Sequence, residues 1–138
     1  MASATMLRRL ARAGYRLTGP RRAILDAVAN RRGHFRAEEI LEEARRVAPG
    51  TGRATVFRTL ALLTKMDLLE EVHLGEGSHG FVVGDGRHHH HLICSECGRV
   101  VEVHGCELPE AISTLATRER FQIAGHQLEV YGLCRRCQ

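Results

Sequence analysis

No stretch of this 138-residue chain is apolar over enough residues to span a membrane, so a membrane protein is not expected. The basic opening, residues 1–14, lacks the apolar centre and cleavage site of a secretory signal and continues directly into a helical pattern. The zinc-hydrolase motif HExxH is also missing. These absences favour a cytoplasmic protein and argue against a secreted protein or a zinc hydrolase.

Most of the cysteines are grouped in pairs. Four of the five cysteines form two Cys-x-x-Cys pairs, Cys94 with Cys97 and Cys134 with Cys137. In a reducing cytoplasm such pairs indicate a metal site, and four thiolates suit one tetrahedral zinc ion. We therefore predict a structural zinc site, with two disulfides or a redox dithiol as the alternative. The fifth thiol, Cys106, is interpreted first as a small buried residue and second as a metal ligand or redox group.

Four consecutive histidines, residues 88–91, precede the first pair. The apolar residues that follow them indicate a β-strand, in which alternate side chains face opposite ways. His88 and His90 then share one face, and His89 and His91 share the other. The pattern predicts parts of two different metal sites on either side of one strand. The alternative, a disordered tract or an affinity tag, fits an internal position poorly.

Charge is divided unevenly between the two halves. Residues 1–83 carry 14 Lys+Arg and 9 Asp+Glu, a net charge of +5. Residues 84–138 carry 6 and 7, a net charge of −1. A basic front half and a metal-rich back half suggest a nucleic-acid reader joined to a sensor.

Apolar periodicity separates the chain into short elements. It predicts helices and then a two-stranded hairpin in the front half, which is the order of a winged helix. The back half is predicted to contain three strands and one helix. The expected helices are 3–13, 20–30, 37–47, about 51–65 and 109–120; the expected strands are 68–74, 80–83, the histidine strand, 100–103 and 121–133.

The fourth helix has the composition of a DNA-reading helix near its beginning. Arginine reads guanine edges in the major groove, and aromatic or threonine groups contact thymine methyls. Taken alone, a helix with two arginines is better explained as an ordinary surface helix. The residues concerned are Arg53, Thr55, Phe57, Arg58 and Thr59.

Four motifs in this order resemble the ferric uptake regulator family of bacterial metal-dependent repressors. They are residues 14–21, 54–60 and 88–98 and the closing Cys-x-x-Cys pair. The resemblance implies an α+β homodimer that binds palindromic operator DNA when loaded with metal, and not an enzyme. It places an N-terminal winged helix-turn-helix domain at 1–83, a hinge at 84–86 and a small C-terminal α/β dimerisation domain at 87–138.

The resemblance also implies roles for single residues. The four paired cysteines correspond to the structural zinc site, and Arg58 and Arg16 to base-reading and minor-groove residues. Phe57 stands where the family usually has tyrosine. The regulatory metal corresponds to His34, His89, His91 and Glu102, and a further site to His88, His90, His126 and an acidic residue. Pro109 occupies the position at which the family usually has that glutamate. Of the neighbouring Glu107 and Glu110, Glu107 is narrowly preferred.

Two departures from the family pattern concern the metal. Val82 stands where iron sensors usually have glutamate, and Val83 or Gly84 stands where zinc sensors often have cysteine. The contiguous histidines and the missing glutamate favour a repressor that senses zinc and controls metal uptake genes, with an iron(II) sensor as the alternative. Rivals from other classes are a zinc hydrolase, a thiol oxidoreductase and a zinc-stapled protein-binding dimer. The replacement wing ligand stays open among Asp85, Glu71 and His73.

Overall fold

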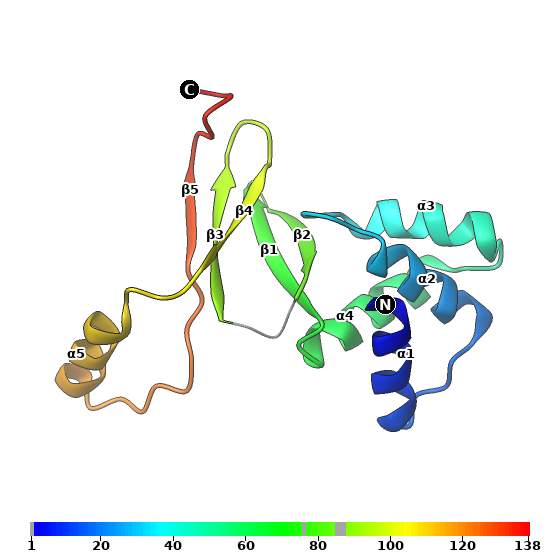
Figure 1. The fold of residues 1–138 in the computed structure, drawn as a ribbon, viewed down its shortest axis with the longest axis horizontal. Coiled ribbons are helices and arrows are strands. Elements are labelled where there is room, and N and C mark those ends of the chain that lie inside the picture. The colour runs from blue at the N-terminus through cyan, green and yellow to red at the C-terminus, as the bar shows by residue number, and fades with distance from the viewer. Residues whose placement is uncertain (1, 76, 85–87) are drawn as a thin grey trace. The chain divides into compact units, whose positions relative to one another are not determined.

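The computed structural model describes residues 2–75, 77–84 and 88–138 (Figure 1). The chain divides into two compact units, residues 1–86 and 87–138. Most of the segment expected as a hinge, including the candidate ligand Asp85, lies outside the described residues. No helix in the described part of the chain is long and apolar enough to cross a membrane.

The first unit contains four helices followed by a β-hairpin. In chain order these are α1 (Ala2–Arg12), α2 (Gly19–Ala29), α3 (Ala37–Val47), α4 (Arg53–Lys65), β1 (Leu69–Gly75) and β2 (Ser78–Val83). Thr18 caps α2, since its side chain accepts a hydrogen bond from the backbone N–H of Arg21, and Pro20 occupies the first turn. The order of helices and hairpin is the winged-helix order expected from the sequence.

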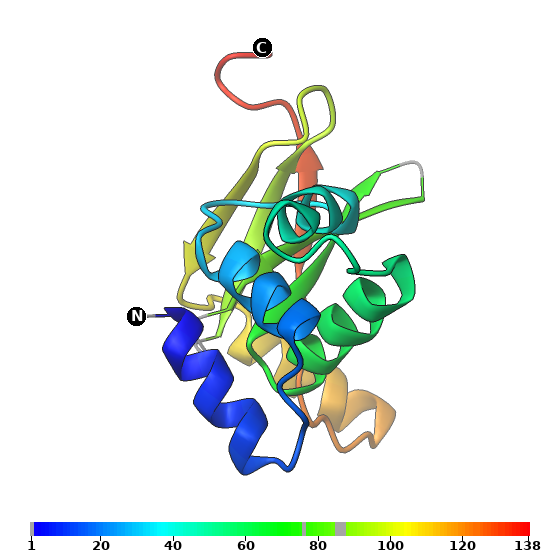
Figure 2. The ribbon, with the colours of Figure 1, turned by 90° about the vertical axis from the view of Figure 1, so that its right-hand side faces the viewer.

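The helices of this unit share one apolar core. Helix α2 contacts all three other helices (Figure 2). Helix α2 contributes a stripe of apolar side chains at helical spacing to this core, and the stripe packs against similar apolar stripes of the neighbouring helices. The largest fully buried aliphatic side chains of the four helices are Leu10, Ile24, Leu25, Val28, Ile40, Val56, Leu60 and Leu63.

A single bridge anchors the loop before α3 to the hairpin. Phe35 and Phe81 exchange two backbone hydrogen bonds, of 2.9 and 2.8 Å, and their rings stack with centroids 6.0 Å apart. Gly80 permits this approach, because a Cβ there would lie 3.3 Å from the Phe35 carbonyl oxygen and 2.9 Å from Leu74 Cδ1. The bridge therefore fixes the backbone next to the half-buried His34.

The second unit is built on a three-stranded sheet of order β4-β3-β5. Strand β3 (His89–Cys94) pairs antiparallel with β4 (Val100–His104) and parallel with β5 (Glu129–Gly132), and α5 (Pro109–Glu119) lies beyond one end of the sheet (Figure 1). The predicted strand at 121–133 is wrong in its extent, since residues 121–128 form no regular element. A parallel strand needs a partner along its length, and only residues 129–132 lie in register with β3.

Candidate metal centres and nucleic-acid interface

The two Cys-x-x-Cys pairs come together at one end of the sheet. Cys94 ends β3 and Cys97 lies in the turn that follows, next to Gly98 with a φ of +71°. Cys134 and Cys137 begin and end the turn after β5. All four sulfur atoms are within 4.8 Å of one another, and Cys97 Sγ is 3.7 Å from Cys134 Sγ. A tetrahedral zinc with Zn–S bonds of about 2.3 Å separates its sulfurs by about 3.8 Å. The cluster therefore fits one tetrahedral ion.

The thiols of this cluster differ in their affinity for protons. Backbone hydrogen bonds from Cys97 and Cys134 lower the pKa of Cys94 to about 6. Hydrogen bonds with the thiols of Cys134 and Cys97 raise the pKa of Cys137 to about 12. Cys94 therefore ionises more readily than Cys137, and a divalent cation bound to both would displace the proton of Cys137.

One face of β3 gathers imidazole and carboxylate groups. His91 lies between Glu102 on β4 and Glu129 on β5, and His89 lies opposite His104. The rings of His89 and His91 have centroids 5.0 Å apart. Burial and then His89 lower the pKa of His91, while Glu102 and Glu129 raise it. A lowered pKa keeps the imidazole neutral, as a metal ligand must be.

Two carboxylates flank His91 on this face. Glu102 is exposed, so its carboxylate carries no burial cost. Glu129 was not foreseen, although its register beside His91 makes it the second carboxylate of the row. The sequence carries no signal for this neighbour, because Glu129 is far from the histidines along the chain and reaches His91 only through the parallel pairing of β5 with β3.

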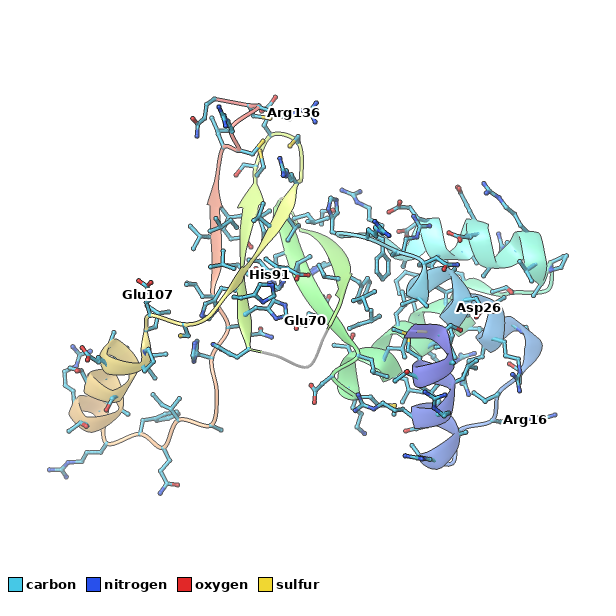
Figure 3. The ribbon with its side chains drawn as sticks, in the orientation of Figure 1. Arg16, Asp26, Glu70, His91, Glu107 and Arg136 are labelled. Atoms are coloured by element: carbon cyan, nitrogen blue, oxygen red, sulfur yellow. The ribbon has the colours of Figure 1, made fainter. Side chains whose placement is uncertain are left out.

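The opposite face of β3 begins with a second histidine cluster. His88, His90, Cys106 and His126 offer ligand atoms that all lie within 4.8 Å of one another. This cluster contains the three histidines expected from the sequence, but Cys106 rather than Glu107 completes it. Figure 3 shows Glu107 in the segment before α5.

Beyond that cluster the same face is an apolar row. Leu92 lies directly between Val101 on β4 and Val130 on β5. These three side chains are 45%, 39% and 44% exposed. Apolar groups that remain accessible side by side make this row a candidate interaction surface.

The beginning of α4 presents the DNA-reading residues expected from the sequence. Phe57, Arg58 and Arg53 are exposed and Thr55 is half-buried. The Arg53 guanidinium lies 5.0 Å from the Phe57 ring centroid and forms an ion pair with Glu38 at 3.0 Å. Arg58 forms no ion pair in the described part of the chain.

Two further residues considered for DNA contact differ in their exposure. Thr59 is fully buried, and its hydroxyl donates to the Thr55 carbonyl, so the expectation that it faces DNA is wrong. Helical periodicity turns that position inward. Arg16 is exposed in the loop before α2 and extends away from the helices of its unit (Figure 3).

The wing hairpin carries Val82 and two of the residues considered as a replacement for the missing wing ligand, Glu71 and His73. Val82 is buried, and its aliphatic side chain offers no ligand atom. Glu71 and His73 are exposed, and both interact with His79: a Glu71 oxygen lies 3.3 Å from its Nδ1 and the two imidazole centroids are 4.8 Å apart. Glu70 lies directly opposite Val82 in the antiparallel register.

Known proteins resemble this chain over almost its whole length. The Bacillus subtilis ferric uptake regulation protein is 34% identical over 128 residues, which cover 89% of this chain and 85% of that protein. The peroxide operon regulator of the same organism is 33% identical over 133 residues, covering 95% and 90%. A zinc uptake regulator solved in complex with zinc and DNA matches with a TM-score of 0.75 at 25% identity, covering 98% of this chain and 91% of that one.

The family assignment rests on the agreement of the two kinds of comparison. A sequence model of the ferric uptake regulator family matches residues 12–131, which include α4, the hairpin and the first Cys-x-x-Cys pair. The structural likeness extends through both units. The chain belongs to the ferric uptake regulator family, whose members are metal-responsive, DNA-binding transcriptional regulators and not enzymes.

Proposed function

We propose that this protein is a cytoplasmic, zinc-sensing repressor of metal uptake genes. The observation that carries the choice of zinc is Val82, a buried valine at the position where iron sensors of the family usually carry a glutamate. The likeness to a zinc uptake regulator supports the same choice. Iron(II) is the second candidate, favoured by the identity with a ferric uptake regulation protein.

The regulatory metal is assigned to His34, His89, His91 and Glu102. Glu102 and His91 support this assignment because they lie side by side on paired strands. For the missing wing carboxylate the hairpin register favours Glu70 over Glu71 and His73. Directly opposite residues of an antiparallel pair project from the same face about 5 Å apart, so Glu70 offers a carboxylate beside the Val82 position.

The four-cysteine cluster is assigned to structural zinc. Four thiolates fill the tetrahedral coordination sphere, so the ion would have no open position for a substrate. Its chemical contribution is to join the turn after β3 to the turn after β5. Residues 87–138 bury few side chains of their own, chiefly Ile93, Cys94 and the histidines of β3, so such a link would stabilise them strongly.

The apolar row formed by Leu92, Val101 and Val130 is assigned to a homodimer contact. A small unit with its sheet face accessible gains most from covering that face with a second copy. Residues 87–138 are therefore the proposed dimerisation domain, residues 84–86 the hinge and residues 1–83 the DNA reader. A symmetric dimer matches a palindromic operator, because each winged helix then reads one half-site.

Metal and DNA binding are coupled in this proposal. Arg58 and the neighbouring Arg53, Thr55 and Phe57 enter the major groove, and Arg16 contacts the minor groove. In the DNA-competent arrangement, the two winged helices fit two successive major grooves. Regulatory metal has a higher affinity for this arrangement than for any other. Such differential affinity is the free energy that couples metal to DNA, and it acts in both directions.

The test is operator binding followed by fluorescence anisotropy at buffered free metal concentrations. The protein keeps its thiolate-bound zinc but is stripped of labile metal. Zinc, iron(II) and manganese(II) are added in separate titrations to a palindromic operator and to a scrambled duplex. We expect zinc to raise operator affinity at least about tenfold, or about 1.4 kcal/mol, and His89→Ala to remove this effect.

The matched control is His79→Ala, which removes an imidazole from the wing hairpin and not from β3. It should leave the response to zinc intact. A response to iron(II) alone would replace zinc by the second candidate. Equal affinity with and without every metal would show that the protein is not a metal-dependent repressor.

A further inference from the structure

The second histidine cluster contains a thiol where the sequence predicts a carboxylate. His88 Nε2 lies 3.0 Å from His126 Nε2, and Cys106 Sγ lies 3.2 Å from the same His126 nitrogen. A tetrahedral zinc with Zn–N bonds of about 2.0 Å separates its nitrogens by about 3.3 Å. The ligand atoms are thus already near the spacing that one small cation requires.

His90 provides an independent indication of a ligand. Its side chain is only 6% exposed, yet neither ring nitrogen has a hydrogen-bond partner among the described residues. A buried polar group without a partner is costly, and most such groups in proteins are satisfied. The His90 ring packs against the rings of His88 and His126, with centroids 4.7 and 5.3 Å away. An ion at this cluster would satisfy the unpartnered imidazole.

The chain positions all four groups from different segments. His90 belongs to β3 and His88 directly precedes it, Cys106 follows β4, and His126 lies in the irregular segment before β5. Cys106 is half-buried. Pro109 starts α5 three residues later, and no carboxylate belongs to the cluster within the described residues.

We propose that Cys106 replaces the acidic residue of the further site implied by the family resemblance, so that His88, His90, Cys106 and His126 form a closed metal site with one thiolate and three imidazoles that selects zinc. Borderline and soft ions favour such a nitrogen and sulfur donor set, whereas manganese and magnesium favour oxygen donors. Four protein ligands leave no open position, so the site orders the unit rather than performing catalysis. Cys106, and not Glu107, is its fourth ligand. The inference deepens the proposed function and rests on it only for the regulatory meaning of the metal.

Cobalt(II) provides the test, because a thiolate bound to cobalt(II) absorbs in the near ultraviolet and an imidazole or carboxylate does not. Full-length protein retaining one zinc per chain in the four-cysteine cluster is titrated with cobalt(II). Wild type should develop this charge-transfer absorption together with the visible bands of tetrahedral cobalt. Cys106→Ser should lose the charge-transfer absorption and bind zinc at least about tenfold more weakly. Glu107→Gln, the matched neighbour, should keep both properties.

Zinc release is measured in the same titration with a chromogenic chelator, to detect cobalt that displaces zinc from the four-cysteine cluster. Undiminished absorption in Cys106→Ser, or its loss in Glu107→Gln, would overturn the proposal. A wild-type protein that binds no cobalt would overturn it too. The outcome is independent of DNA: a thiolate–cobalt signal together with metal-independent operator binding would retain the site and refute the proposed function.

A second measurement needs no variant and guards against misfolding. Wild-type protein is alkylated with iodoacetamide, and the modified peptides are identified by mass. Cys106 should react when labile metal is absent and be protected by one added equivalent of zinc, whereas manganese(II) should protect it much less. Equal reactivity of Cys106 with and without zinc would contradict ligation by this thiol.

Discussion

Arg58 is the side chain best placed to read bases. It is exposed near the beginning of α4, whereas the neighbouring Arg53 is already engaged with Glu38 and Phe57. We expect Arg58→Ala to weaken specific operator binding by about 1–3 kcal/mol, because a bidentate arginine–guanine contact has that value. Anisotropy with the operator and with single-base variants of it measures the effect. Discrimination at one base pair should fall together with affinity.

The matched control for this prediction is Arg46→Ala on α3. Arg46 is also exposed, so the substitution removes the same charge from the same unit without altering α4. Its effect should be small and equal for all duplexes. If the two variants lose the same affinity on operator and scrambled DNA, Arg58 contributes only general electrostatic attraction.

The metal ligands show which residue-level features the sequence encodes. The two Cys-x-x-Cys pairs carry their geometry locally, since each pair lies within one turn. The choice between Cys106 and Glu107 depends on the path of the chain between β4 and α5, which no local pattern determines. Glu129 lies beside His91 only because β5 pairs with β3. Local motifs were therefore predictable, and contacts that depend on distant pairing were not.

At the scale of elements, the bridge between the loop before α3 and β2 controls the position of His34. We expect Gly80→Ala to destabilise the first unit by about 1–2 kcal/mol, because the added Cβ would crowd the Phe35 carbonyl and Leu74. The midpoint of thermal unfolding, followed by the helical circular dichroism signal, should fall by roughly 2–6 °C. Regulatory metal affinity should fall as well, because the backbone next to His34 shifts.

Gly50→Ala is the control at this scale. No atom lies within 4 Å of the position of its added Cβ, so the substitution should be neutral or slightly stabilising. An unchanged midpoint in Gly80→Ala would mean that Leu74 and the bridge adjust without cost. His34 would then not depend on the close approach at Gly80.

The elements themselves were predictable to different degrees. The front helices follow from apolar stripes, and Thr18 and Pro20 mark the beginning of α2 as expected. The strand predicted at 121–133 is too long, because alternating apolar residues there lack a partner except over Glu129–Gly132. Helix α5 was predicted correctly, yet none of its residues is buried. Periodicity identifies an element that has an apolar side, but not what covers that side.

The two units differ in how they achieve stability. The four helices of the first unit enclose a continuous aliphatic core. The sheet of the second unit buries few apolar side chains and leaves the row of Leu92, Val101 and Val130 accessible. A unit of this size rarely gains enough from its own core, and metals or a second copy supply the remainder. The proposed metal sites and the apolar row of the sheet fit that requirement together.

Val130→Glu tests the whole assembly. A carboxylate on the apolar row would be buried without a partner at the proposed dimer contact, which costs several kcal/mol for each copy. We expect light scattering with size-exclusion chromatography to give the monomer mass for this variant and the dimer mass for wild type. Val47→Glu is the matched control, since Val47 is 78% exposed at the end of α3 and belongs to the first unit. It should remain a dimer.

Both variants should retain one tightly bound zinc, because neither touches the four cysteines. Only Val130→Glu should lose high-affinity binding to a palindromic operator. Its affinity for a duplex with a single half-site should stay close to that of one wild-type winged helix. A dimeric Val130→Glu protein would place the dimer contact elsewhere on the molecule.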